Sequence, residues 1–275
     1  MKTLADFTQA KHDTTKLVML TAYDYPSACL AQEAGADIIL VGDSLGMVVL
    51  GYDSTVPVTM EDMIHHTKAV RRGAGQTFLL TDMPFMSYHC VPQALENAAR
   101  LVQAGGCQAV KVEGGQEIVP QVQALVRAGL PVCAHIGLTP QSATALSGYK
   151  VQGRTAQAAR KLIDDAKALE QAGAFMLVLE CIPTQVAEHI TSQVAMPTIG
   201  IGAGAACDGQ VLVFHDVLGL FDRFTPKFVK QYATLGKIAQ HALAQYAQDV
   251  RTGAFPGPEH SFTLHEDELQ RLYGK

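Results

Sequence analysis

A lysine and a glutamate lie two residues apart at the end of an apolar run, in the segment Gln108-Ala-Val-Lys111-Val-Glu113-Gly-Gly115. Alternate side chains of an extended strand share a face, so Lys111 and Glu113 should point to one side and Val110 and Val112 to the other. A cation and an anion would then meet at one strand end, an arrangement suited to binding or activating a charged small molecule.

Other apolar runs also end in an ionisable residue, namely Asp43, Asp82, His135 and Glu180. If these runs are parallel strands, their carboxyl ends meet at one face of the fold. We therefore expect the five strand ends to outline an active site.

The acids Asp43, Asp82 and Glu113 end three successive apolar runs. Oxygen ligands suit a hard cation such as Mg²⁺, which takes carboxylates, waters and substrate oxygens. The alternative is that some of these acids cap helix N-termini. Their placement on neighbouring strands favours a shared role.

Lys111 has two functional interpretations, a cation that binds a substrate carboxylate or an amine that forms a Schiff base. A lysine paired only with Glu113 is the structural alternative. We favour the binding role, because a nearby metal ion and a Schiff base would stabilise the same carbanion.

His135 and Glu180 are candidates for proton chemistry. His135 would hydrogen-bond a substrate oxygen or shuttle a proton, unless it is a satisfied core histidine. Glu180 follows the mostly apolar Phe175–Leu179 and is predicted to be the general base.

A strand, polar tip, helix and glycine recur along the chain. Helices close with glycine just before an apolar run at Glu33-Ala-Gly-Ala36, Gln103-Ala-Gly-Gly106, Arg127-Ala-Gly129 and Gln171-Ala-Gly-Ala174. The strands are predicted near 17–20, 37–42, 77–82, 108–113, 131–135, 174–180, 196–200 and 211–214. This pattern predicts a closed (β/α)₈ TIM barrel in the α/β class. A doubly wound sheet is the alternative, but Gly200–Gly204 matches the dinucleotide fingerprint weakly and comes late in the chain.

The chain is predicted to be a single domain over residues 1–275, with a barrel core at about 17–250. A short helix within residues 1–16 should pack across one barrel end. Residues 226–251 are predicted to be helical, and the tail beyond them peripheral. The long segment 44–57 is either a lid or an inert excursion.

Composition limits the partners. The 275 residues are 48% hydrophobic and carry a net charge of −5 without a basic block, which argues against nucleic acid or an anionic membrane. No apolar run approaches a membrane span. We expect a cytoplasmic protein whose 6 scattered cysteines are reduced, buried thiols.

Five segments then identify a family resemblance. In order, the chain carries Gly42-Asp-Ser-Leu-Gly46, Lys111-Val-Glu-Gly-Gly115, His135-Ile-Gly-Leu-Thr-Pro-Gln-Ser142, Gly148-Tyr-Lys-Val-Gln-Gly153 and Gly200-Ile-Gly-Ala-Gly204. With these motifs the chain closely resembles the ketopantoate hydroxymethyltransferases, from about Leu17 to Phe262. The resemblance implies a (β/α)₈ barrel akin to the phosphoenolpyruvate mutase and isocitrate lyase enzymes.

The resemblance also implies a reaction. The family transfers a hydroxymethyl group from methylenetetrahydrofolate to 3-methyl-2-oxobutanoate (2-oxoisovalerate), giving 2-dehydropantoate through an enolate on the route to pantothenate and coenzyme A. Carried over, one Mg²⁺ per subunit is held by Asp43, Asp82 and Glu113. Asp43, Ser44, Asp82, Lys111 and His135 bind the keto acid, and Glu180 accepts the proton. Large rings of barrels in bacterial members imply a homo-oligomer, a homodecamer.

Two other functions stay open. An isomerase or lyase with the same barrel would need a phosphate cradle near Gly200–Gly204. A silent binding or scaffold protein would not need four aligned carboxylates and a lysine. Tetrahydromethanopterin is an alternative one-carbon donor.

Overall fold

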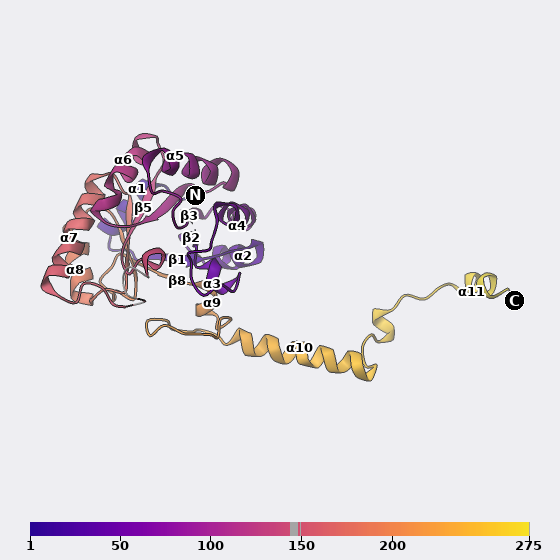
Figure 1. Cartoon of the computed structure of the whole chain (residues 1–275). Helices are drawn as coiled ribbons and strands as arrows, with labels where there is room; N and C mark the ends of the chain where they lie inside the picture. The colour runs from indigo at the N-terminus through magenta and orange to yellow at the C-terminus, as the bar shows by residue number, and fades with distance from the viewer. Residues whose placement is uncertain (144–147, 149, 275) are drawn as a thin grey trace.

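Eight parallel strands close into a barrel in the computed structural model, which describes residues 1–143, 148 and 150–274 (Figure 1). Each strand pairs with the next along the chain, and the eighth pairs with the first. The strands are β1 (Leu17–Thr21), β2 (Ile38–Val41), β3 (Phe78–Asp82), β4 (Ala109–Glu113), β5 (Val132–Gly137), β6 (Met176–Glu180), β7 (Thr198–Ile201) and β8 (Gly209–Leu212). The predicted (β/α)₈ barrel is confirmed, and the open sheet is excluded.

Helices cover the outside of the barrel and occupy its loops. The α-helices are α1 (Leu4–His12), α2 (Tyr25–Glu33), α3 (Leu45–Val48), α4 (Met60–Gly73), α5 (Val91–Arg100), α6 (Val119–Arg127), α7 (Ala156–Gln171), α8 (Thr184–Gln193), α9 (Phe214–Val217), α10 (Leu235–Thr252) and α11 (Glu266–Tyr273). Short turns of π or 3₁₀ helix are η1 (Leu101–Gly105), η2 (Gln116–Ile118), η3 (Pro140–Ser142) and η4 (Pro258–His260). Side-chain capping fixes where several helices begin. Thr59 and Asp62 form a reciprocal capping box at the start of α4, and the Thr155 side chain accepts a hydrogen bond from the Ala158 backbone N–H at the start of α7.

The barrel interior is filled at its amino-terminal end by apolar side chains from the strands and from α1. Phe7 of α1 is fully buried, and its ring lies edge-on to Phe78 with centroids 5.1 Å apart. Other interior residues are Leu17, Met19, Ile38, Leu40, Leu80, Ala109, Cys133, Met176, Val178, Ile199 and Val211. The predicted lead-in helix therefore closes one barrel end, which leaves the opposite end for polar side chains.

Strand β4 shows the predicted alternation. Val110 and Val112 join the apolar layer between the barrel and its helices. Lys111 and Glu113 point inward and line a cavity at the carboxyl end. The period-2 geometry of a strand thus carries both charged groups to the same place.

Two boundaries differ from the predictions. The last strand covers Gly209–Leu212, because Gly209 and Gln210 pair with β7 while Phe214 already begins α9. Gln210 interrupts the apolar run, so the predicted strand began at residue 211, two residues after the observed start at Gly209. The predicted helix 226–251 begins only at Leu235, since residues 226–234 fold as turns and bends over the barrel mouth.

The C-terminal region leaves the barrel. Helix α10 and the tail through α11 extend away from it, and neither helix has a buried residue (Figure 1). On α10 the side chains of Ile238, Leu243 and Tyr246 are 56–68% exposed. The tail is peripheral to the barrel, as predicted, but α10 presents an uncovered apolar face.

The 6 cysteines are free thiols. Cys107, Cys133 and Cys207 are buried as expected, whereas the other three are only half-buried. Within the described part of the chain, no helix combines the length and apolar character that a membrane crossing requires.

We predict that Gly137→Ala destabilises the barrel more than Gly129→Ala. Both glycines have positive φ, +100° and +82°, but a Cβ on Gly137 would overlap the Glu180 carbonyl oxygen, whereas one on Gly129 meets nothing within 4 Å. The control should cost about 1–2 kcal/mol from backbone strain, and Gly137→Ala about 1–3 kcal/mol more from overpacking. Urea unfolding measures both, and equal losses would contradict the predicted clash.

Candidate active site

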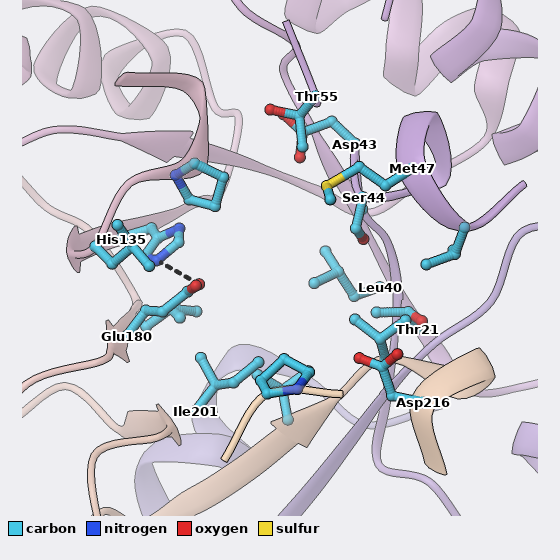
Figure 2. A pocket seen from close by; sticks show the side chains of 18 of the residues that line it. Thr21, Leu40, Asp43, Ser44, Met47, Thr55, His135, Glu180, Ile201 and Asp216 are labelled. Carbon is cyan, nitrogen blue, oxygen red and sulfur yellow. Dashed lines mark ion pairs between the residues drawn. The ribbon is translucent and has the colours of Figure 1, made fainter. Parts of the chain in front are cut away.

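The carboxyl ends of the strands open into a cavity of about 380 Å³ (Figure 2). Every site residue predicted from the sequence lines it: Asp43, Ser44, Asp82, Lys111, Glu113, His135 and Glu180. They come from five strands and the residues just after them. The barrel therefore gathers side chains that lie up to 137 positions apart, from 43 to 180, around one space.

Lys111 stands at the centre of the polar contacts and is only 4% exposed. Its Nζ lies 3.0 Å from Asp82 Oδ1 and 3.6 Å from Glu113 Oε1. Burial alone would lower the pKa of this amine, but the two carboxylates outweigh it and raise the pKa above its usual value. Lys111 is therefore a fixed ammonium group at neutral pH.

His135 links this group to Glu180. Its Nδ1 lies 3.2 Å from Glu113 Oε1, and its Nε2 lies 3.2 Å from Glu180 Oε2 without the alignment of a hydrogen bond. Burial and the Lys111 ammonium disfavour the protonated ring, yet the two glutamates raise the pKa of His135 to about 9. An imidazolium can donate protons in hydrogen bonds but cannot accept one, so the ring is a poor candidate for the base.

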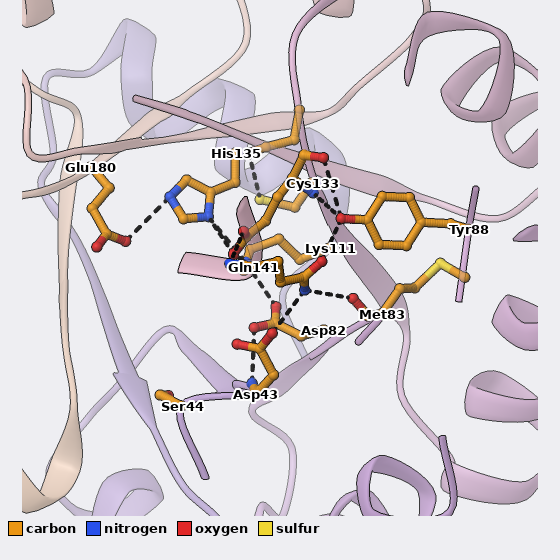
Figure 3. A network of polar contacts seen from close by, with 12 residues as sticks. Asp43, Ser44, Asp82, Met83, Tyr88, Lys111, Cys133, His135, Gln141 and Glu180 are labelled. Atoms are coloured by element: carbon orange, nitrogen blue, oxygen red, sulfur yellow. Dashed lines mark hydrogen bonds and ion pairs between the residues drawn. The ribbon is translucent and has the colours of Figure 1, made fainter. Parts of the chain in front are cut away.

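Asp43 and Asp82 meet on the other side of Lys111 (Figure 3). The Asp43 amide donates to Asp82 Oδ2 at 3.0 Å, and Gln141 Nε2 donates to Asp43 Oδ2 at 2.8 Å. Burial, with repulsion from Asp82 and Glu113, raises the pKa of Asp43 well above its ordinary value. The acids on this side are short of positive charge.

Two neutral residues that the sequence patterns did not single out hold this network. The Tyr88 hydroxyl donates to Gln141 Oε1 at 2.6 Å, and the backbone N–H of Gln141 donates to Glu113 Oε2 at 3.1 Å. Gln141 thus contacts both Asp43 and Glu113. It belongs to the segment His135–Ser142, but no charge pattern marks a neutral amide.

The acids fit a hard cation by their chemistry. Among the described residues, no three His, Cys, Asp or Glu side chains are grouped as ligands of one ion, and Asp82 and Glu113 are instead paired with Lys111 and His135. Mg²⁺ commonly takes only one or two carboxylates and completes its shell with water and substrate oxygens. Asp43 and Asp82 are adjacent and share a single cation, Lys111, so they suit that role, with Glu113 on the other side of Lys111.

Ser44 begins the long segment 44–57, and its Oγ lies 2.8 Å from the Tyr23 hydroxyl. This segment folds partly as α3, and Met47, Val48 and Thr55 line the cavity wall. The segment is therefore part of the site. Of the motif 148–153, Tyr149 lies outside the described residues.

The backbone just after Glu180 is strained. Cys181 has a φ of +47°, which is uncommon for a residue with a side chain. Its amide donates to the Ile201 carbonyl at 2.9 Å, and its carbonyl accepts from the Gln152 amide at 2.9 Å. Both bonds hold the strained turn and so fix the direction in which Glu180 enters the cavity.

Asp216 was also missed as a site residue. It lies in α9, just after β8, and lines the cavity across from His135 and Glu180 (Figure 2). The rule that found the other acids, an ionisable group after an apolar run, applies to Val211–Phe214 and points to the pair His215-Asp216 that follows it.

Known proteins resemble the chain in sequence and in fold. A family model described as ketopantoate hydroxymethyltransferase matches residues 1–258. A protein of Geobacillus sp. (strain WCH70) named 3-methyl-2-oxobutanoate hydroxymethyltransferase is 61% identical over 275 residues, covering 100% of this chain and 99% of that protein.

Solved structures share the barrel at low identity. A phosphonopyruvate hydrolase in complex with oxalate and Mg²⁺ is 13% identical, with a TM-score of 0.63 over 100% of this chain and 95% of that one. A 2,3-dimethylmalate lyase of the phosphoenolpyruvate mutase/isocitrate lyase superfamily is 16% identical, with a TM-score of 0.58 over 100% and 94%. These likenesses concern the fold, whereas the sequence matches define the family. The chain belongs to the ketopantoate hydroxymethyltransferase family and is an enzyme of that class.

Proposed function

We propose that the enzyme transfers a hydroxymethyl group from methylenetetrahydrofolate to 3-methyl-2-oxobutanoate, giving 2-dehydropantoate for pantothenate and coenzyme A synthesis. The observation that carries the proposal is the buried chain of contacts from Asp43 through Lys111 to Glu180 at one cavity. It combines cations for an anionic keto acid with a carboxylate for proton removal. The name of the 61% identical relative supports this substrate.

The keto acid carries an anionic carboxylate and one further oxygen, the 2-oxo oxygen, and both groups need donors. The Lys111 ammonium and the His135 imidazolium offer N–H groups to its carboxylate and 2-oxo oxygens, and Ser44 offers a hydroxyl. Asp43 and Asp82 would hold Mg²⁺, with Glu113 contributing directly or through water. When bound, the ion would supply positive charge against the oxygen charge that grows as the enolate forms.

Glu180 is the proposed base. Its carboxylate takes the proton from C3 of the keto acid, and the bonding pair moves into the C2–C3 bond to form the enolate. C3 then bonds to the one-carbon unit as one of its carbon–nitrogen bonds to the folate breaks. Water replaces the second nitrogen and supplies the hydroxyl oxygen, and the two nitrogens take up the proton lost from C3 and one proton from water as tetrahydrofolate leaves. His135, 3.2 Å from Glu180 Oε2, holds the carboxylate in place.

A phosphate-handling lyase or isomerase is disfavoured by the turn after β7. A Cβ on Gly202 would lie 2.8 Å from the Phe228 ring, and one on Gly204 would lie 2.5 Å from Thr184. The absence of a side chain on Gly202 and Gly204 therefore makes room for Phe228 and Thr184 of the protein itself. They leave no open cradle for a phosphate at that turn.

Assembly is a further part of the proposal. The uncovered apolar face of α10 supports a homo-oligomer, because exposed apolar patches favour contact with another protein. The expected form is a homodecamer. The matched relative's name says nothing of assembly.

We predict that Glu180→Gln slows exchange of the C3 proton of 3-methyl-2-oxobutanoate with deuterated water by roughly 10²-fold or more. The amide keeps the shape of the side chain but cannot take the proton. Enzyme, Mg²⁺ and keto acid suffice for the assay, which proton NMR follows without folate. Glu188→Gln, an exposed glutamate on α8, is the matched control. Exchange at the parent rate with metal and keto acid bound would place the base elsewhere.

Lys111 should act as a cation and form no imine. Borohydride added with the keto acid should leave the protein mass unchanged, because reduction traps only a Schiff base. Intact-mass spectrometry with and without keto acid makes the comparison. An adduct mapped to Lys111 would reverse the assignment.

Light scattering should give an oligomer mass at micromolar concentration, at ten times the 29.4 kDa subunit for the decamer. A monomer under these conditions would rule out the proposed assembly.

A further inference from the structure

Asp216 is a buried acid without a protein partner. Its side chain is 8% exposed, and among the described residues none donates a hydrogen bond to its carboxylate or forms an ion pair with it. Burial raises the pKa of this carboxyl to about 6, so it is mostly ionised at neutral pH. The carboxylate faces the cavity without a donor from the described part of the chain, so a ligand in the cavity can supply the donors that it lacks.

The position of Asp216 separates it from the keto acid. His135 and Glu180 occupy the opposite cavity wall (Figure 2). Lys111 is linked to His135 through Glu113, whose Oε1 lies 3.6 Å from Lys111 Nζ and 3.2 Å from His135 Nδ1. An anionic keto acid held by Lys111 and His135 gains nothing from a second anion across the cavity. Asp216 is therefore placed to meet the other substrate of the proposed reaction.

The wall around Asp216 suits a flat heterocycle. Val213, Ile201 and the aromatic residues Phe221, Phe224 and Phe228 line the same cavity as Asp216. The Phe228 ring packs against Gly202 and is thereby held in place, since a Cβ on that glycine would lie 2.8 Å from it. Apolar side chains next to a single hydrogen-bond acceptor, here the Asp216 carboxylate, are typical of a site that binds a planar ring and fixes its orientation at one edge.

The head group of a reduced folate matches this acceptor. A 2-amino-4-oxopteridine presents N3–H and the 2-amino N–H side by side, and a carboxylate accepts two parallel hydrogen bonds of that spacing. Lys227 lines the rim, is exposed and has no ion pair in the described part of the chain. Its ammonium is suitably placed for the anionic glutamate tail.

We propose that Asp216 is the specificity residue for the one-carbon donor, accepting two hydrogen bonds from the 2-amino-pteridine edge while Phe224 and Phe228 cover the ring. The inference rests on the proposed function, because it takes methylenetetrahydrofolate as the donor.

The test compares tetrahydrofolate with its analogue that carries a methyl group in place of the 2-amino group. Isothermal titration calorimetry with Mg²⁺ and keto acid present should show that the parent enzyme binds tetrahydrofolate roughly 10–100-fold more tightly, the usual worth of hydrogen bonds to a charged group. Equal affinities in the parent overturn the inference, and this arm needs no variant.

The variant Asp216→Asn keeps the shape but turns one acceptor into a donor. It should bind tetrahydrofolate roughly 10-fold or more weakly, lose the discrimination against the methyl analogue, and raise KM for methylenetetrahydrofolate more than it lowers kcat. Asp222→Asn removes the same charge from an exposed position beyond the cavity and is the matched control. A well-folded Asp216→Asn that still discriminates as the parent does overturns the inference.

Failure of the proposed function has a different signature. If the parent enzyme does not exchange the C3 proton of the keto acid, the proposed reaction fails whatever Asp216 binds. If exchange proceeds and neither calorimetric difference appears, only the assignment of Asp216 is wrong.

Discussion

The buried ammonium of Lys111 is the constraint on which the site depends. A charge at 4% exposure is stable only with close partners, and Asp82 and Glu113 supply them. The strand register makes this possible, because Asp82 stands directly beside Lys111 in the pairing of β3 with β4. Removing either acid would leave a buried charge uncompensated.

That constraint propagates to both sides of the cavity. Glu113 also contacts His135, which in turn contacts Glu180, so the proposed base is oriented by a chain of charges that begins at Lys111. On the other side Asp82 accepts from the Asp43 amide, and Gln141 holds Asp43. Burial, followed by repulsion from Asp82 and Glu113, raises the pKa of Asp43, and the same excess of acid suits a divalent cation.

The two walls of the cavity have opposite character. One side presents the cations and the glutamate suited to an anionic keto acid, and the other presents Asp216, with Asp43 and Ser44 also on that side (Figure 2). This division places two different substrates in one space without competition for the same groups. The turns at 226–234, predicted to be helical, supply Pro226, Lys227 and Phe228 to the second wall.

The sequence alone determined the barrel and one wall of the site. Periodicity marked the strands, glycine stops marked the helix ends, and charged residues after apolar runs marked Asp43, Asp82, Lys111, Glu113, His135 and Glu180. These signals are local, because strand alternation and strand ends are properties of short segments.

Only the tertiary structure decided which groups meet. Gln141 reaches Asp43 across 98 positions of sequence, and no local pattern encodes a neutral amide's partner. Glu113 and Glu180 raise the pKa of His135 against the effect of burial, burial raises the pKa of Asp216, and both effects depend on neighbours brought by barrel closure. Contacts between distant segments and the exclusion of water are properties of the closed barrel, so they could be known only once the chain was folded.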